Sequence, residues 1–137
     1  MLNAREAVWK DGHFGAYTRF EGEQARFPAL GVNIGVLEPG QPACHYHGED
    51  EQEDFLVLSG ECILLIEGQE RHLRAWDFVH CPPWTEHVFV GAVAQRELVD
   101  GVDDLAGVEH ETRDPAESYA GIPADVPTGY REGWLAG

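Results

Sequence analysis

Three histidines and a group of acidic residues are the side chains best able to do chemistry in this chain. His45 and His47 lie two residues apart, and His87 follows a Pro-Pro turn later in the sequence. If the first pair lies on a β-strand, its two imidazoles point to the same face and can reach one cation. An acidic run follows the pair and comprises Glu49, Asp50, Glu51, Glu53 and Asp54. Imidazole with carboxylate suits a divalent transition metal, and Fe, Mn, Ni, Zn and Cu all remain open.

The elements that must position these residues are predicted to be short β-strands. In residues 31–38 apolar positions alternate with Asn33 and Gly35, which indicates a half-buried strand. Further strands are expected at 13–20, 54–58, 62–66, 71–73, 77–81, 87–90 and 95–99, with a hairpin turn at 67–70. Residues 1–12 are expected to be a lead-in, either an edge strand or a covering arm. Many short strands without a long amphipathic helix favour a sandwich or a barrel.

The same residues resemble the two sequence motifs of the cupins. The first cupin motif is G-x5-H-x-H-x3,4-E-x6-G, and it is tracked here by Gly40, His45, His47, Glu53 and Gly60. The second is G-x5-P-x-G-x2-H-x3-N, and it is tracked by Pro82 and His87, with residues 61–75 as a short intermotif segment. The resemblance covers about residues 31–99. It implies an all-β jelly-roll barrel (a double-stranded β-helix) with a metal inside one end, held by His45, His47, Glu53 and His87.

The spacing of the first motif differs from the family pattern at two places. Four residues, rather than five, separate Gly40 from His45, and five residues separate His47 from Glu53, one more than usual. Glu53 is the preferred carboxylate because its spacing to Gly60 is that of the family. It also shares a strand face with two further side chains, Phe55 and Val57. Glu51 and Gln52 remain alternatives to Glu53.

The second motif differs at its glycines and at its last position. Trp76 and Trp84 stand where the family has glycine, and Gly91 stands where it has asparagine. A tryptophan at such a turn would either narrow the barrel mouth or pack harmlessly, and harmless packing is the preferred interpretation. Of the other reactive side chains, His72 and His80 are expected to be structural or exposed. Cys81 is expected to be a small buried thiol.

Length and charge limit what the chain can be and bind. A chain of 137 residues fits a single domain. We expect this domain to comprise N-terminal strands or an arm (1–30), a cupin core (31–100) and a mostly irregular tail (101–137). The tail is expected to pack on the barrel or on a partner subunit. The formal net charge of −16 argues against nucleic acid and anionic membranes as partners. Three cysteines form no CxxC pair, and no secretory signal or membrane span is visible, so a cytoplasmic location is expected.

These observations favour a metal-dependent enzyme of the oxygenase type acting on a small organic molecule, because cupins include dioxygenases. The alternative is a non-enzymatic module that binds a small molecule or a metal, since a fold does not determine function. Glu53 would serve as a metal ligand or as a general base, in a pocket lined by Phe55, Val57 and Phe89. Metal affinity should fall as the pH drops below about 6.5, because only neutral imidazole binds metal. Aromatic residues in the tail and strands apolar on both faces predict a homodimer.

Overall fold

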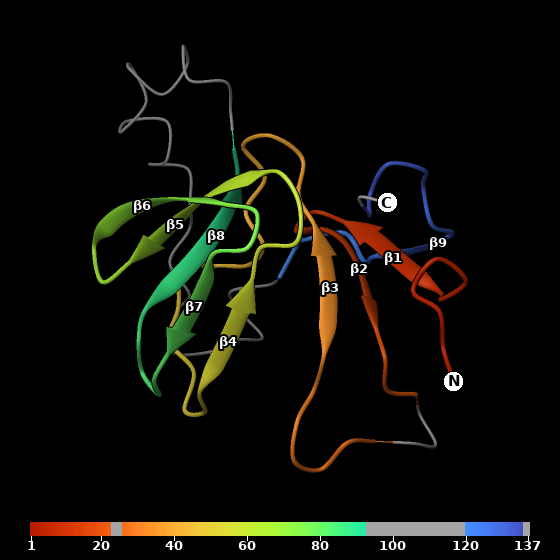
Figure 1. Ribbon diagram of the computed structural model, residues 1–137, viewed down its shortest axis with the longest axis horizontal. Helices are drawn as coiled ribbons and strands as arrows, with labels where there is room; N and C mark the ends of the chain where they lie inside the picture. Colours follow the sequence, from red (N-terminus) through yellow and green to blue (C-terminus); the bar gives the residue numbers. More distant parts are fainter. Residues whose placement is uncertain (23–25, 93–119, 136–137) are drawn as a thin grey trace.

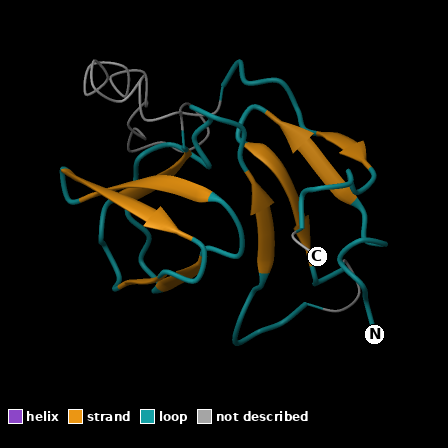
Figure 2. Ribbon diagram, turned by 45° about the horizontal axis from the view of Figure 1, so that its top comes forward, coloured by secondary structure: helices purple, strands orange, loops and turns teal. Residues whose placement is uncertain are grey.

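The computed structural model of the chain describes residues 1–22, 26–92 and 120–135, and every regular element within these ranges is a β-strand (Figures 1 and 2). Within the described residues, nine strands form three antiparallel sheets. The all-β jelly-roll class expected from the sequence is thereby confirmed. No helix in the described ranges is long and apolar enough to cross a membrane.

The first sheet contains the first and the last of the described strands. Its strand order is β3 (Asn33–Val36), β2 (Gly15–Arg19), β1 (Trp9–Gly12) and β9 (Val126–Thr128), and it lies at the right in Figure 1. The N-terminal segment therefore supplies an inner strand, and the expectation of an edge strand or a covering arm was wrong. The reason is that the late strand β9 pairs with β1 on the side that β2 leaves open.

The other two sheets carry the residues of the two motifs. One pairs β4 (Glu53–Leu56) with β7 (Phe78–Cys81), and the other has the order β6 (Gln69–Arg74), β5 (Glu61–Ile66) and β8 (His87–Gly91). The hairpin predicted at residues 67–70 joins β5 to β6. Every residue of β8 is buried, and the fully buried Ile63, Val88 and Val90 lie where β5 pairs with β8.

The described part of the C-terminal segment packs against the first sheet. Trp9 is fully buried, and its ring centroid lies 4.9 Å from that of Trp134 and 6.3 Å from that of Tyr130. Arg131 forms an ion pair with Asp11 across a 2.7 Å gap between Nη2 and Oδ2. The strand predicted at residues 95–99, together with Tyr119 and most of the acidic tail, lies outside the described residues. The predicted division into three segments stays a prediction.

The three unusual residues of the second motif have distinct backbone environments. Trp76 and Trp84 adopt left-handed φ values of 76° and 66°, which glycine tolerates and tryptophan rarely adopts. Their side chains are 73% and 69% exposed, so they do not pack as expected. Gly91 lies very close to the segment that contains Glu38, and a Cβ at Gly91 would be 2.1 Å from the carbonyl oxygen of Glu38. An asparagine could not occupy this position, which explains the departure from the family pattern.

Candidate metal centre

The segment that carries the first motif runs antiparallel to β8 and the turn before it. Near its start, the amide of Ala43 donates to the carbonyl of Phe89 at 2.8 Å. Further along, His47 and His87 form an isolated bridge and exchange both backbone hydrogen bonds, at 2.9 and 3.3 Å. The amide of Trp84 then donates to the carbonyl of Glu49 at 2.6 Å. Two histidines from distant parts of the sequence are therefore held opposite each other by main-chain contacts.

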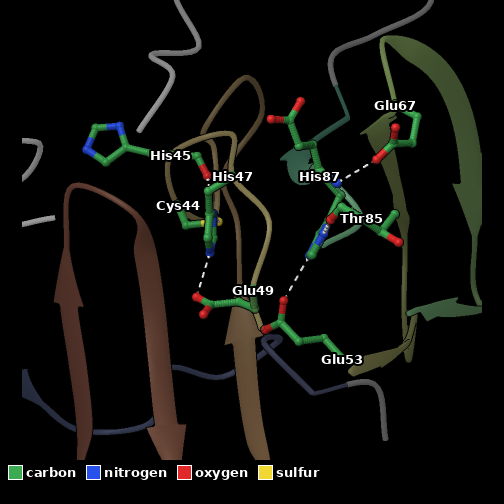
Figure 3. Close-up of polar contacts among 9 residues, drawn as sticks. Cys44, His45, His47, Glu49, Glu53, Glu67, Thr85 and His87 are labelled. Atoms are coloured by element: carbon green, nitrogen blue, oxygen red, sulfur yellow. Dashed lines mark hydrogen bonds and ion pairs between the residues drawn. The ribbon is translucent and has the colours of Figure 1, made fainter. Parts of the chain in front are cut away.

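The segment bulges between these two contacts, and the bulge separates the two histidines of the first motif. His47 is four residues beyond Ala43, whereas the facing residues Phe89 and His87 are only two residues apart. The first segment therefore contains two extra residues between the two contacts. Extra residues in one strand of a pair change the direction of side chains locally. The His45 ring accordingly points away from the His47 and His87 rings (Figure 3) and packs edge-on against Phe14, with ring centroids 5.1 Å apart. The expectation that an extended strand places His45 and His47 on one face was wrong.

The rings of His47 and His87 lie side by side and are oriented by backbone carbonyls. Their centroids are 6.0 Å apart with an interplanar angle of 29°. Nδ1 of His47 is 2.7 Å from the carbonyl oxygen of His45, and Nδ1 of His87 is 2.8 Å from that of Thr85. A carbonyl oxygen only accepts, so hydrogen-bond chemistry assigns a proton to each Nδ1. Nε2 is then the nitrogen that can lose its proton and bind a metal.

Each of these Nε2 atoms faces a carboxylate, as Figure 3 shows. Nε2 of His47 lies 2.9 Å from Oε1 of Glu49, and Nε2 of His87 lies 3.2 Å from Oε2 of Glu53. The two histidine side chains are 14% and 3% exposed, whereas those of Glu49 and Glu53 are 49% and 36% exposed. The imidazoles therefore form the inner wall of the site and the carboxylates its solvent side.

Hydrogen bonds in the site raise the pKa values of the two histidines and lower that of Glu53. The hydrogen bond from His87 lowers the pKa of Glu53 despite opposing burial. Burial would lower the pKa of His87, but the hydrogen bonds to Glu53 and to the Thr85 carbonyl outweigh it, and the net shift is upward. The pKa of His47 is raised to about 10, chiefly by the Cys44 thiol 3.7 Å from Nδ1, with smaller contributions from the His45 carbonyl and Glu49. Without a metal, the site favours imidazolium paired with carboxylate.

Two of the predicted pocket residues lie against His87. The Phe55 ring meets the His87 ring at a centroid distance of 5.2 Å and an interplanar angle of 65°. Phe55 and Phe89 are themselves 4.4 Å apart between centroids, and the centroids of Phe89 and His87 are 6.2 Å apart. Val57 is half-buried and lies one residue beyond the end of β4. The structure thus places an aromatic wall beside His87.

The alternative carboxylate positions and the remaining reactive residues lie elsewhere. Glu51 is exposed before β4, and the side-chain amide of Gln52 donates from Nε2 to Oδ2 of Asp54 at 3.1 Å. Asp54 also pairs with His80 on the exposed side of the β4–β7 sheet, at 2.6 Å between Oδ1 and Nδ1. The exposed His72 pairs with the half-buried Glu70, at 3.0 Å between Nε2 and Oε1. Cys81, only 1% exposed, is the register partner of Glu53, and burial raises the pKa of its thiol.

Glu49 is the site residue that the sequence did not single out. It is one of five acidic residues in a short run, and nothing in its own spacing separates it from the others. The one sequence feature that distinguishes Glu49 is the glycine before it, Gly48. A glycine is needed there because a Cβ would be only 3.2 Å from the Trp84 backbone. In the ranges that the structure describes, no group of three or more His, Cys, Asp or Glu side chains is arranged as a metal-binding cluster. The four side chains stand instead as two separate His–carboxylate pairs.

Comparison with known proteins now decides the family. Residues 33–96 match the cupin domain family. This segment of the chain is a cupin domain. The matched segment contains every member of the two His–carboxylate pairs, whereas β1, β2 and β9 lie outside it. No curated protein matches the chain. Cupins often bind transition metals, so the donor set of this cupin can be tested for that chemistry.

The chemistry of the donor set fits a divalent transition metal. Metal-binding histidines almost always donate their other ring N–H to a carbonyl or carboxylate, and both His47 and His87 do so through Nδ1. Each Nε2 is accompanied by a carboxylate oxygen, the other donor type that Fe and Mn accept readily. The members of this set that could hold a metal are His47, His87, Glu53 and Glu49.

Proposed function

We propose that this cupin binds one divalent transition metal at the His47 and His87 pairs and uses it to act on a small organic molecule, most simply as an oxygenase. The observation that carries the proposal is that both Nδ1 atoms are committed to backbone carbonyls, which directs both Nε2 atoms to carboxylates. In the metal-free protein, a proton on each Nε2 would be shared with the facing carboxylate oxygen, at 2.9 and 3.2 Å. A divalent cation binds the same two donor types once that proton is released.

A metal in such a site supplies Lewis-acid polarisation of a bound oxygen atom. The chain's own residues decide what can approach it. Phe55 and Phe89 form an apolar wall beside the buried His87, which excludes water on that side and offers few hydrogen-bonding groups. This environment favours an aromatic or short aliphatic substrate over a sugar. The exposed carboxylates leave the opposite side open to solvent and substrate.

The electrostatics of Glu53 favour its role as a ligand over its role as a base. A general base works best when its pKa lies near the operating pH, but the hydrogen bond from His87 holds the pKa of Glu53 below its ordinary value. A carboxylate that is always ionised is a good metal donor and a weak proton acceptor. This observation also supports the alternative function, a metal-dependent binding module without turnover.

The experiment that tests the proposal combines metal content with oxygen consumption across a panel of small phenols and carboxylic acids. Oxygen uptake by the metal-loaded protein supports the oxygenase, and saturable ligand binding without uptake supports the binding module. Glu53→Gln preserves size and removes the charge. If Glu53 is a ligand, this variant loses metal; if Glu53 is a base, it keeps metal and loses turnover. Unchanged metal content and unchanged activity would show that Glu53 is not part of the site.

A cytoplasmic location and a homodimer complete the proposal. The three cysteines are all free thiols in the structure, which supports a reducing compartment. On the β4–β7 sheet, Leu56 and Phe78 are register partners and are 48% and 63% exposed. Apolar side chains gathered on one sheet face support burial against a second copy of the chain. Sedimentation at micromolar concentration should give a species of twice the chain mass, and a single-chain mass would contradict the dimer.

A further inference from the structure

We propose that Glu67 is a positioning residue for His87: its carboxylate fixes one peptide group, and that peptide group holds the His87 ring. Glu67 lies in the β5–β6 turn, outside the two His–carboxylate pairs. The placement of the ring concerns the protein without a metal, and only its effect on metal affinity rests on the proposed function. Three observations carry the inference: the hydrogen bonds of the peptide group, the anchoring of the turn, and the presence of glutamate at a position that disfavours it.

The peptide group between Thr85 and Glu86 forms a hydrogen bond on each side. Its N–H, on Glu86, donates to Oε1 of Glu67 at 2.7 Å (Figure 3). Its carbonyl oxygen, on Thr85, accepts from Nδ1 of His87 at 2.8 Å. A trans peptide group is planar, so its N–H and C=O point in opposite directions and can only turn together. The carboxylate of Glu67 therefore determines where the Thr85 carbonyl points.

The hydrogen bond between Glu86 and Glu67 also strengthens the one that follows it. Its acceptor is a carboxylate, and hydrogen bonds to an ionised acceptor are shorter and stronger than those between neutral groups. Hydrogen bonds in a chain polarise one another, so the Thr85 carbonyl becomes a better acceptor. A better acceptor there favours the His87 tautomer that carries its proton on Nδ1. Nε2, which faces Glu53 at 3.2 Å, is then the nitrogen that can bind a metal.

The β5–β6 turn is anchored to both segments that carry the motif histidines, and this holds the Glu67 carboxylate in place. The amide of Glu67 donates to the carbonyl of Glu86 at 2.9 Å, so the two residues are joined by two hydrogen bonds. The amide of Gly68 donates at 3.0 Å to the hydroxyl of Tyr46, a residue of the first motif that is only 8% exposed. The turn therefore connects the segment of the first motif with the loop that presents His87.

Glutamate is an unusual residue at this turn. Its two central residues, Glu67 and Gly68, both have left-handed φ values, 48° and 70°. Two-residue hairpin turns of this kind favour Asn-Gly or Asp-Gly, because asparagine and aspartate tolerate this backbone conformation better than other side chains do. Aspartate would supply the same charge at a lower conformational cost, but its side chain is one methylene shorter. The reach to the Glu86 amide is the property that glutamate has and aspartate lacks.

The test is nuclear magnetic resonance of the ring nitrogens in the full-length, isotope-labelled protein, at a pH where the His87 imidazole is neutral. The His87 signals are identified by their absence in His87→Gln, and the wild type should be mainly the Nδ1–H tautomer. Glu67→Asp keeps the charge and suits the turn but shortens the side chain. The ratio of Nε2–H to Nδ1–H tautomer should then rise at least about threefold, because a hydrogen bond of ordinary strength is lost. Glu67→Gln keeps an acceptor oxygen with the same reach, and its ratio should stay within about twofold of the wild type.

Glu70→Gln is the matched control. Glu70 belongs to the same hairpin, but its Oε1 pairs with Nε2 of the exposed His72 at 3.0 Å, so this variant should leave the His87 tautomer unchanged. Titration of the same variants with Mn²⁺ measures the consequence for the proposed function. Glu67→Asp should weaken binding at least about threefold, less than the tenfold or more that is typical of a group in direct contact with a ligand. Glu67→Gln and Glu70→Gln should each change affinity less than about twofold.

The outcomes separate this inference from the proposed function. If the wild-type protein binds no divalent metal, the proposed function fails, while the tautomer measurement still decides the inference. If wild-type His87 is mainly the Nε2–H tautomer, or if Glu67→Asp leaves the ratio unchanged, the inference is overturned. It is also overturned if Glu67→Gln or Glu70→Gln shifts the ratio as much as Glu67→Asp does, because neither removes the acceptor from the Glu86 amide. Circular dichroism establishes that each variant is folded, and Glu67→Asn, equally short and equally suited to the turn, replaces Glu67→Asp if that variant is not.

Discussion

Trp84 holds a backbone conformation that its own side chain disfavours, and replacing it with glycine should stabilise the protein. Its φ of 66° is in the left-handed region, where the Cβ of an L-residue crowds the following carbonyl. The ring is 69% exposed, so its removal sacrifices little buried area. Trp76, with φ of 76° and 73% exposure, offers an independent second position for the same substitution.

The magnitude follows from two opposing contributions. Relief of the left-handed conformation is worth about 1–2 kcal/mol. Glycine also makes the unfolded chain more flexible, which costs roughly 0.4–1 kcal/mol. Trp84→Gly should therefore raise the free energy of unfolding by about 0.8 kcal/mol, the middle of a range of roughly 0–1.6 kcal/mol. This corresponds to a rise of roughly 2–5 °C in Tm for a domain of this size.

Urea denaturation of the metal-free protein measures this change, and Trp84→Ala provides the matched control. Alanine removes the ring but keeps the Cβ, so the strained φ remains and no gain in stability is expected. The reasoning predicts the order glycine above alanine at both Trp84 and Trp76. A glycine variant that is less stable than the alanine variant at the same position would refute the assignment of strain and would show that the indole ring contributes to the fold.

Four further predictions concern pH and packing. Metal affinity should keep rising as the pH is raised above about 6.5. The pKa of His47 is raised to about 10, so protons compete with the metal for this imidazole well into the alkaline range. Titrations with Mn²⁺ at a series of pH values measure this change. In the metal-free protein, the raised pKa of His47 should also increase the free energy of unfolding. This contribution is complete below about pH 6.5 and is lost as the pH rises through the pKa of the folded state. The midpoint of urea denaturation at each pH measures it. Gly91→Ala should lower the free energy of unfolding, measured in urea, by at least about 2 kcal/mol, because the new Cβ would clash with the Glu38 carbonyl. Gly35→Ala is the control, because a Cβ there has open space, and it should lower the free energy of unfolding by less than about 1 kcal/mol. Trp9→Ala should cost about 3–5 kcal/mol by the same measurement, because the indole is fully buried.

Most strands could be predicted from the sequence because their patterns are local. The alternation in residues 31–38 corresponds to β3, and the turn at 67–70 corresponds to the β5–β6 hairpin. The role of β1 could not be predicted in this way. Trp9 becomes an inner-strand residue only because Val126–Thr128, more than a hundred residues later, pairs beside it. Sequence patterning does not contain information about such distant pairing.

The site was predictable in its residue types and less so in its geometry. Motif spacing singled out His47, Glu53 and His87 as metal ligands, and that role stays a prediction. The structure places their side chains in facing pairs with Glu49. The position of His45 was mistaken because the alternation of side chains holds only for regular strands. The bulge that turns it depends on the register with β8, which the residues between 43 and 47 do not specify by themselves.

The central claim is that His47 and His87 hold a divalent metal, and metal stoichiometry after reconstitution tests it most directly. The metal-free protein would be incubated with Mn²⁺ or Fe²⁺ without oxygen, freed of excess metal, and measured by elemental analysis beside His87→Ala. The account predicts about one metal ion per wild-type chain, and well under half of that in the variant, because a buried ligand has been removed. A wild-type protein that retains no metal, or a variant that retains as much as the wild type, would contradict the account.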